Sequence, residues 1–144
     1  MKNLIIATLL SVSLATTAFA APTSGNSATT NFKSDFKGAT NVSWKTTADF
    51  VKATFVMNNE RREAFYDLEG NIIATSKAVS FAELSENVKT VLSEKYGNYT
   101  IRELVQMEVT DTKAMYISLE YDKETLILKV DNWGVVTKWA KSKK

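Results

Sequence analysis

Residues 64–75 read AFYDLEGNIIAT, a turn set between two apolar runs. Asp67 and Gly70 suit such a turn, because an aspartate side chain hydrogen-bonds to nearby backbone and glycine adopts a positive φ without strain. The sequence therefore predicts a strand at 64–66, a hairpin turn at 67–71 and a return strand at 72–75. A second turn of this kind, DNWG, stands at 131–134.

The shift along the chain that lays 67–70 over 131–134 relates other segments as well. Asn58-Asn59-Glu60 falls on Asp122-Lys123-Glu124, and Phe55 falls on Leu119. We expect two repeats, about 32–77 and 80–141, each made of a helix followed by antiparallel strands. The predicted class is α+β, in which the tandem repeats form one sheet with both helices on one face.

Apolar spacing predicts the elements of each repeat. Phe32, Phe36 and Ala39 have helical spacing, and a second helix is expected from Ser80 to Tyr96, with Ser80 and Glu83 as a capping box. Alternation of apolar and polar residues predicts the remaining strands at 42–45, 51–58, 101–109, 114–121, 125–130 and 135–139.

The start of the chain, 1–20, is typical of a secretory signal peptide. Lys2 precedes an apolar run at 4–15, and Ala18, Phe19 and Ala20 form a small-residue exit, which predicts cleavage after Ala20. A membrane anchor is the alternative, but Ser and Thr interrupt the run, and a span needs about 20 mostly apolar residues. We expect a periplasmic or secreted protein with no membrane span after signal removal.

Beyond the signal, the polar stretch at 21–31 predicts a flexible leader, and 32–144 a single domain. Without residues 1–20 the chain keeps 17 basic and 16 acidic residues, so its charge offers no long-range attraction to nucleic acid. The chain has no cysteine and no histidine. This excludes disulfides, histidine-based acid–base catalysis and histidine-ligated metals, and we predict no cofactor and no metal site.

Several segments together resemble a known family. Phe36, residues 41–44 (NVSW), residues 53–55 (ATF) and residues 64–75 resemble the PepSY-like, β-lactamase-inhibitor-protein-like family of exported bacterial proteins, common in Bacteroidetes. The resemblance covers about 32–138 and implies tandem helix-plus-strand repeats. The namesake inhibitor binds a secreted enzyme through the open face of its sheet and its hairpin loops. It is braced by disulfides and this chain has no cysteine, so the resemblance implies the fold and a binding sheet rather than inhibition of β-lactamase.

Alternation also assigns the two faces of the predicted sheet. The face toward the helices would hold Val51, Ala53, Phe55, Met57, Met115, Ile117, Leu119 and Tyr121. The opposite face would present aromatic and charged residues, among them Lys52, Phe65, Tyr116, Lys129 and Trp139. Exposed aromatics among charges are typical of an interaction patch. The alternative is that they form cross-strand pairs that stiffen the sheet.

Acidic residues gather in the predicted turns, at Asp67, Glu69, Asp122, Glu124 and Asp131. They could bind calcium or support glycoside hydrolysis, but turns favour Asp and Glu for structural reasons. No catalytic residue is therefore predicted.

The sequence favours an exported, non-catalytic binding or inhibitor-like module that recognises a protein or peptide in the periplasm through the open sheet face. Trp133, in a turn, is expected to be exposed. The candidate contact residues are Phe65, Tyr116, Trp133, Trp139, Lys52 and Lys129. Two alternatives stay open: a structural or envelope protein of unknown ligand, and a carboxylate-dependent hydrolase.

Overall fold

The computed structural model of the chain describes residues 26–143. The predicted signal peptide, its cleavage residues Ala18 and Ala20, and the first part of the predicted leader lie outside these residues. Among the described residues, no helix is long and apolar enough to cross a membrane.

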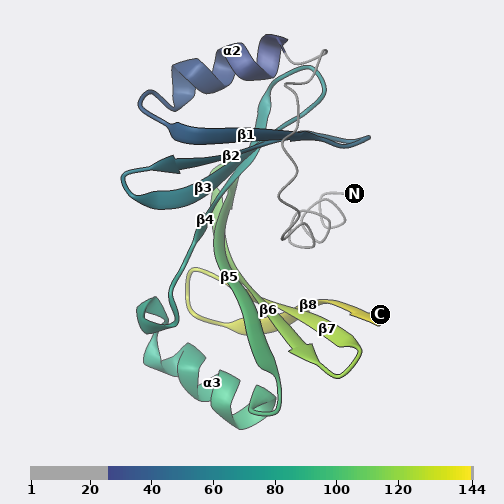
Figure 1. Ribbon diagram of the computed structural model, residues 1–144. Coiled ribbons are helices and arrows are strands. Elements are labelled where there is room, and N and C mark those ends of the chain that lie inside the picture. Colours follow the sequence, from purple (N-terminus) through teal and green to yellow (C-terminus); the bar gives the residue numbers. More distant parts are fainter. Residues whose placement is uncertain (1–25, 144) are drawn as a thin grey trace. The chain divides into compact units, whose positions relative to one another are not determined.

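The described residues form two α-helices and one open eight-stranded antiparallel sheet, in which the strands follow chain order (Figure 1). The predicted α+β class is confirmed. The helices are α2 (Asn26–Asp35) and α3 (Glu86–Tyr96), with a short 3-10 helix η1 (Phe81–Glu83) before α3. The strands are β1 (Thr40–Thr46), β2 (Val51–Met57), β3 (Glu60–Tyr66), β4 (Ile72–Ala78), β5 (Thr100–Val109), β6 (Thr112–Tyr121), β7 (Glu124–Val130) and β8 (Val136–Lys143).

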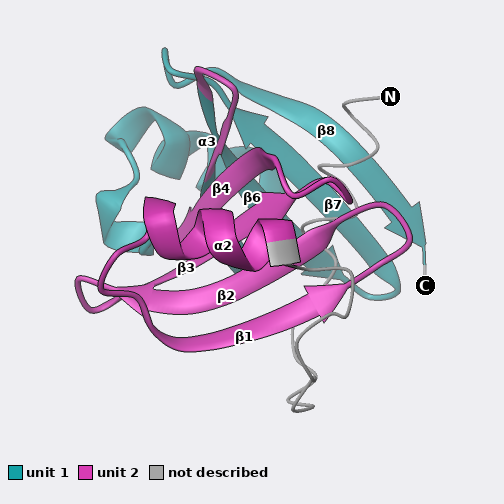
Figure 2. Ribbon diagram, turned by 90° about the horizontal axis from the view of Figure 1, so that it is seen from above, with its two compact units in different colours: residues 1–16, 79–106, 113–144 teal, residues 17–78, 107–112 magenta. Residues whose placement is uncertain are grey.

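The chain divides into two compact units, coloured separately in Figure 2. Of the described residues, the first unit in chain order (magenta, unit 2 in Figure 2) holds 26–78 and 107–112, and the second (teal, unit 1 in Figure 2) holds 79–106 and 113–143.

In the first unit, α2 packs on the sheet through aromatic rings. The ring of Phe32 meets the ring of Phe55 edge-on at 4.9 Å between centroids and that of Trp44 at 5.3 Å. The buried cluster confirms the predicted helix-facing side of β2. Its members are Ala28, Phe32, Val51, Ala53, Phe55, Ala64 and Tyr66.

Two predictions at the start of the domain are wrong. The first helix begins at Asn26 rather than near Phe32, so 26–31 is helical and not part of a flexible leader. The physical reason is tertiary: Ala28, one turn before Phe32, is buried in the cluster, and the Asn31 side chain donates a hydrogen bond of 2.8 Å to the Gly70 carbonyl. These contacts hold a polar segment that has no helical pattern of its own.

In the second unit, α3 packs its buried residues Val88 and Leu92 against an aliphatic cluster. The cluster contains Leu84, Val88, Leu92, Leu104, Ile117, Leu119, Leu126, Leu128 and Val130, with Met115 partly buried beside it. The predicted inward direction of Met115, Ile117 and Leu119 is therefore confirmed. Tyr121, at the end of β6, also lies on this side, since its ring meets that of Tyr99 at 5.5 Å between centroids, but it is 54% exposed.

The predicted single helix from Ser80 to Tyr96 is also wrong, because the segment is broken at Leu84. Leu84 is extended (ψ 142°) and buried in the core, and Ser85 then caps α3 by accepting a hydrogen bond from the Val88 N–H at 3.4 Å. Burial of Leu84 thus outweighs helix continuity. The Ser80 N–H still donates to Glu83 at 2.7 Å, but the helix that begins there is only the three-residue η1.

Candidate functional site

The predicted contact residues of the first unit, Lys52 and Phe65, lie opposite each other on β2 and β3 and are buried. Phe65 is 1% exposed and Lys52 is 6% exposed, so the expectation that they stand on an open surface is wrong. Phe65 packs edge-on against Phe50 at 5.8 Å between centroids, and Lys52 Nζ lies 2.9 Å from Glu63 Oε1. Alternation identifies the face of a strand, but it carries no information on what covers that face.

In the second unit, three predicted residues come together. Trp139 lies edge-on to Tyr116 at 5.7 Å between centroids, and Lys129 Nζ stands 4.8 Å from the centre of the Trp139 ring. Tyr116 is 3% exposed, which again contradicts the expected exposure, and burial raises the pKa of its hydroxyl. Trp139 and Lys129 are half-buried. The Tyr116–Trp139 contact is the aromatic pair that the sequence left open as an alternative.

Trp133 behaves as predicted. It lies in the turn between β7 and β8 and is 87% exposed. The turn is nevertheless well ordered, because Asp131 Oδ1 accepts hydrogen bonds of 2.9 Å from the backbone N–H groups of both Trp133 and Val135. The Gly134 N–H donates to the Asp131 carbonyl at 3.0 Å, and Asn87 near the start of α3 donates to the Gly134 carbonyl at 3.2 Å. The exposed indole thus stands on a turn whose backbone is held by hydrogen bonds.

The turn between β3 and β4 has the same construction. Asp67 Oδ1 accepts from the Asn71 N–H at 2.7 Å, and the Gly70 N–H donates to the Asp67 carbonyl at 3.1 Å. A helix asparagine, Asn31, donates to the Gly70 carbonyl, as Asn87 does to that of Gly134. Gly70 (φ 93°) and Gly134 (φ 80°) both occupy the left-handed region. The origin of the two turns by duplication stays a prediction.

The two turns differ at one informative position. The residue that matches Trp133 is Glu69, which is also exposed. A charged residue therefore fits the turn as well as tryptophan does, and the turn geometry does not require the indole.

Two of the acidic turn residues, Asp67 and Asp131, have structural partners. The Asn71 side chain donates to Asp67 Oδ2 at 3.0 Å and, with backbone N–H groups, lowers the pKa of that carboxyl. Asp131 orders the Trp133 turn as described, and Asp122 has a positive φ of 52° between β6 and β7. Among residues 26–143, no group of three or more acidic residues is placed to hold a metal ion. The contacts of Asp67 and Asp131 give these two carboxylates a structural role in their turns.

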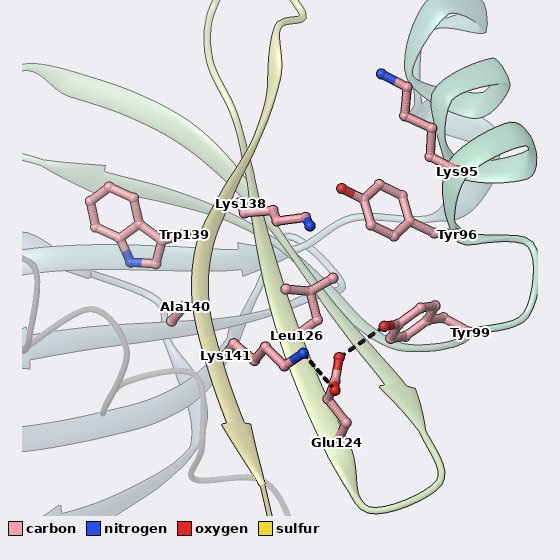
Figure 3. A pocket seen from close by; sticks show the side chains of 9 residues that line it. All are labelled: Lys95, Tyr96, Tyr99, Glu124, Leu126, Lys138, Trp139, Ala140 and Lys141. Carbon is pink, nitrogen blue, oxygen red and sulfur yellow. Dashed lines mark hydrogen bonds and ion pairs between the residues drawn. The ribbon is translucent and has the colours of Figure 1, made fainter.

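The sequence did not predict a pocket of about 350 Å³ in the second unit, between the end of α3 and strands β7 and β8 (Figure 3). Lys95 and Tyr96 come from α3, and Lys138 and Lys141 extend from β8 toward them, while Trp139 and Ala140 point to the other side of the strand. The lining residues are Lys95, Tyr96, Tyr99, Glu124, Leu126, Lys138, Trp139, Ala140 and Lys141.

A register shift in β8 explains why alternation missed this pocket. Lys138 and Lys141 are three residues apart, which would place them on opposite faces of a regular strand. Leu128 pairs with Lys138 and Leu126 with Lys141, so both lysines share the face of the buried leucines. The extra residue between these pairs forms a β-bulge, which no simple pattern in the sequence announces.

Glu124 organises one wall of the pocket. Its Oε1 accepts a hydrogen bond from the Tyr99 hydroxyl at 2.8 Å, and its Oε2 lies 2.7 Å from Lys141 Nζ. The hydrogen bond from Lys141, followed by that from Tyr99, lowers the pKa of Glu124. The same contacts raise the pKa of Lys141 and of Tyr99.

Comparison with known proteins gives matches by structure alone, since no family and no curated protein matches the chain by sequence. A DUF2874 family protein from Bacteroides ovatus superposes with a TM-score of 0.69 at 19% identity, covering 83% of this chain and 89% of that one. A BLIP-like protein from Bacteroides fragilis gives 0.70 at 17% identity, covering 88% and 90%. The chain has the fold of the DUF2874 and BLIP-like proteins.

A third match extends the comparison. A candidate periplasmic protein from Bacteroides eggerthii superposes with a TM-score of 0.69 at 12% identity, covering 87% of this chain and 90% of that one. The inhibitor-like resemblance predicted from residues 36–75 is thus confirmed at the level of the fold.

Proposed function

We propose that this chain is an exported, non-catalytic binding module that recognises a protein or peptide in the periplasm or outside the cell through Trp133. The observation that carries this proposal is an indole 87% exposed on a turn that does not need it. Tryptophan is the residue most enriched among those that dominate the energy of protein interfaces. Val135, also exposed, adds apolar surface beside it.

The ordered turn favours binding for an energetic reason. Immobilising a flexible side chain or loop on association costs about 0.5–1.5 kcal/mol per side chain. The hydrogen bonds that Asp131 accepts and Asn87 donates fix the backbone around Trp133 before any partner arrives. The loss of conformational entropy on binding is therefore smaller than it would be for a flexible turn.

The proposed contact surface is centred on Trp133 and excludes three of the residues that the sequence predicts to be contacts. Lys52, Phe65 and Tyr116 are buried and so are left out of it. Trp139 and Lys129 contact each other through the cation–ring interaction, which gives them a supporting role in the sheet.

The structural comparisons support the proposal without deciding it. The Bacteroides fragilis match is described as BLIP-like, and the Bacteroides eggerthii match as a candidate periplasmic protein. Both descriptions agree with a binding module outside the cytoplasm.

The test compares two variants of the matched turns. Trp133→Glu installs the residue of the first turn, and Glu69→Ala is the control at the matching position. We expect the wild type and Glu69→Ala to retain the same protein or peptide from a native envelope extract, and Trp133→Glu to lose it. Thermal unfolding should be the same for all three, because both positions are exposed.

A second readout distinguishes specific binding from nonspecific adsorption. When the retained partner is purified and added back, tryptophan emission should shift to the blue and acrylamide quenching should fall, both only while Trp133 is present. Equal retention by the wild type and Trp133→Glu would refute the proposal.

A further inference from the structure

The pocket at the end of α3 has the dimensions of a small-molecule site. Its volume of about 350 Å³ lies at the lower end of the range of about 300–1,000 Å³ found for ligand pockets. All of its lining residues belong to the second unit. It is also separate from the Trp133 turn, which contributes none of the lining.

The charge of the pocket is positive. The lining contains three lysines, Lys95, Lys138 and Lys141, and one carboxylate, Glu124. Glu124 forms an ion pair with Lys141. Neither Lys95 nor Lys138 makes an ion pair with any residue in 26–143. Two ammonium groups therefore stay available, and they belong to lining residues on different elements, Lys95 on α3 and Lys138 on β8.

The remaining lining supplies apolar surface and a hydroxyl donor. The rings of Tyr96 and Tyr99 meet edge-on at 5.9 Å between centroids, and Leu126 lies in the buried core beneath them. The Tyr99 hydroxyl donates a hydrogen bond to Glu124.

Structural roles explain each lysine by itself, but they do not explain why three lysines line one pocket. A lysine in the last helical turn complements the helix dipole, and lysines protect an edge strand from pairing with another chain. Lys95 fits the first role, and β8, the last strand in the sheet, fits the second. Neither role requires the bulge that brings Lys138 to the same side as Lys141.

We infer that this pocket binds a small organic dianion with a compact apolar body, such as an aryl dicarboxylate or an aryl phosphate. Lys95 and Lys138 bind its anionic oxygens, and the ring edges of Tyr96 and Tyr99 contact the body. Glu124 keeps Lys141 and Tyr99 in place and repels ligands that enter on its side. This site is independent of the proposed protein contact through Trp133.

The test follows backbone amide signals by NMR during titration of the signal-free protein with three probes: isophthalate, phenyl phosphate and benzoate. We expect at least one of the two dianions to shift the amides of Tyr96, Tyr99 and Leu126 with a Kd of about 1 mM or below. Benzoate should bind about tenfold more weakly, since it lacks one charge-assisted contact. The dianion that binds more tightly identifies the acidic group.

Matched lysine variants distinguish binding in the pocket from nonspecific electrostatic attraction to the protein. Lys138→Gln should weaken binding of the dianion about tenfold, and Lys143→Gln, on the same strand but outside the pocket, should leave it unchanged. Both positions are exposed, so both variants should fold. Lys37→Gln, at an exposed lysine of the first unit, is a second control, because Lys143 lies opposite Glu124 in the sheet. Equal weakening by the two variants, or no shift near the pocket with either dianion up to about 10 mM, would overturn the inference.

Discussion

The two units place a helix on strands in the same way but fill the space between them differently. In the first unit, aromatic rings dominate: the tilted rings of Phe36 and Phe55 meet at 4.7 Å between centroids, and Phe32 and Trp44 contact each other beside them. In the second unit, the matching space holds leucine, isoleucine and valine, and a pocket opens at the end of α3. The hydrogen bonds of the Asp–Gly turns are shared, whereas the core and the surface differ between the units. The features that suggest recognition, Trp133 and the lysine pocket, both lie in the second unit.

The largest expected effect tests the difference in core packing. Phe55 and Leu119 match when the two Asp–Gly turns are aligned, and they are equally buried. We expect Phe55→Ala to cost about 4 kcal/mol in the free energy of unfolding and Leu119→Ala about 3 kcal/mol, because the phenylalanine loses more contacts and leaves a larger cavity. Urea unfolding, followed by circular dichroism, measures both. A larger loss for Leu119→Ala would break the comparison.

The next effect tests the two glycines. A Cβ on Gly70 would lie 2.5 Å from Ser27 Cβ and 2.7 Å from the Ala28 backbone nitrogen, whereas a Cβ on Gly134 would meet nothing nearer than Ser85 Oγ at 3.9 Å. Both substitutions carry the strain of a positive φ, about 1–2 kcal/mol. Gly70→Ala should therefore cost about 3 kcal/mol and Gly134→Ala about 1 kcal/mol. Equal losses in the free energy of unfolding, measured in urea, would show that the close approach of α2 to Gly70 does not add to the cost of a Cβ there.

A smaller effect concerns the hydroxyl of Tyr66 in the first core. It is buried and has no hydrogen-bond partner among the described residues, and burial, aided by Asp35, raises its pKa. Removing an unsatisfied buried hydroxyl relieves a desolvation cost, so Tyr66→Phe should stabilise the protein by about 1 kcal/mol. Tyr121→Phe, at an exposed tyrosine of the second unit, should change little. Thermal melts of both variants decide the matter, and a loss of stability in Tyr66→Phe would contradict the expectation.

The smallest effect is the pH dependence that Glu124 contributes in the second unit. Because the pKa of Glu124 is lowered from 4.5 in the folded protein, its contribution to stability is present above pH 4.5 and disappears as the pH falls through the lowered value. The wild type should therefore be slightly more stable than Glu124→Gln at pH 7, and the two should converge at low pH. Unfolding curves at a series of pH values test this. A difference that does not change with pH would rule out the ionised Glu124 as its cause.

Much of the fold was predictable because local chemistry specifies it. Asp67 with Gly70 and Asp131 with Gly134 announce their turns, and alternation gives the strands and the inward residues Phe55 and Leu119. The start of α2 was missed because residues 26–31 depend on contacts with distant residues. The break at Leu84 was missed because burial of one leucine outweighed a continuous helical pattern.

The candidate site was predictable only in part. Trp133 could be placed at the surface because it lies in a turn. Phe65 and Tyr116 were assigned to an open face because alternation is blind to what lies above a strand. The lysine pocket depends on the bulge in β8, and a register shift of one residue leaves no periodic trace in the sequence.

That one-residue irregularity at Trp139 has an evolutionary consequence. The extra residue places Trp139 and Ala140 on one side of β8 and Lys138 and Lys141 on the other. Loss of Trp139 would restore regular alternation and leave Lys141 opposite Leu126, so it would remove the contact with Tyr116 and keep both lysines on the face of the pocket. A lineage can therefore shorten this strand by one residue at the bulge without losing the pair of lysines.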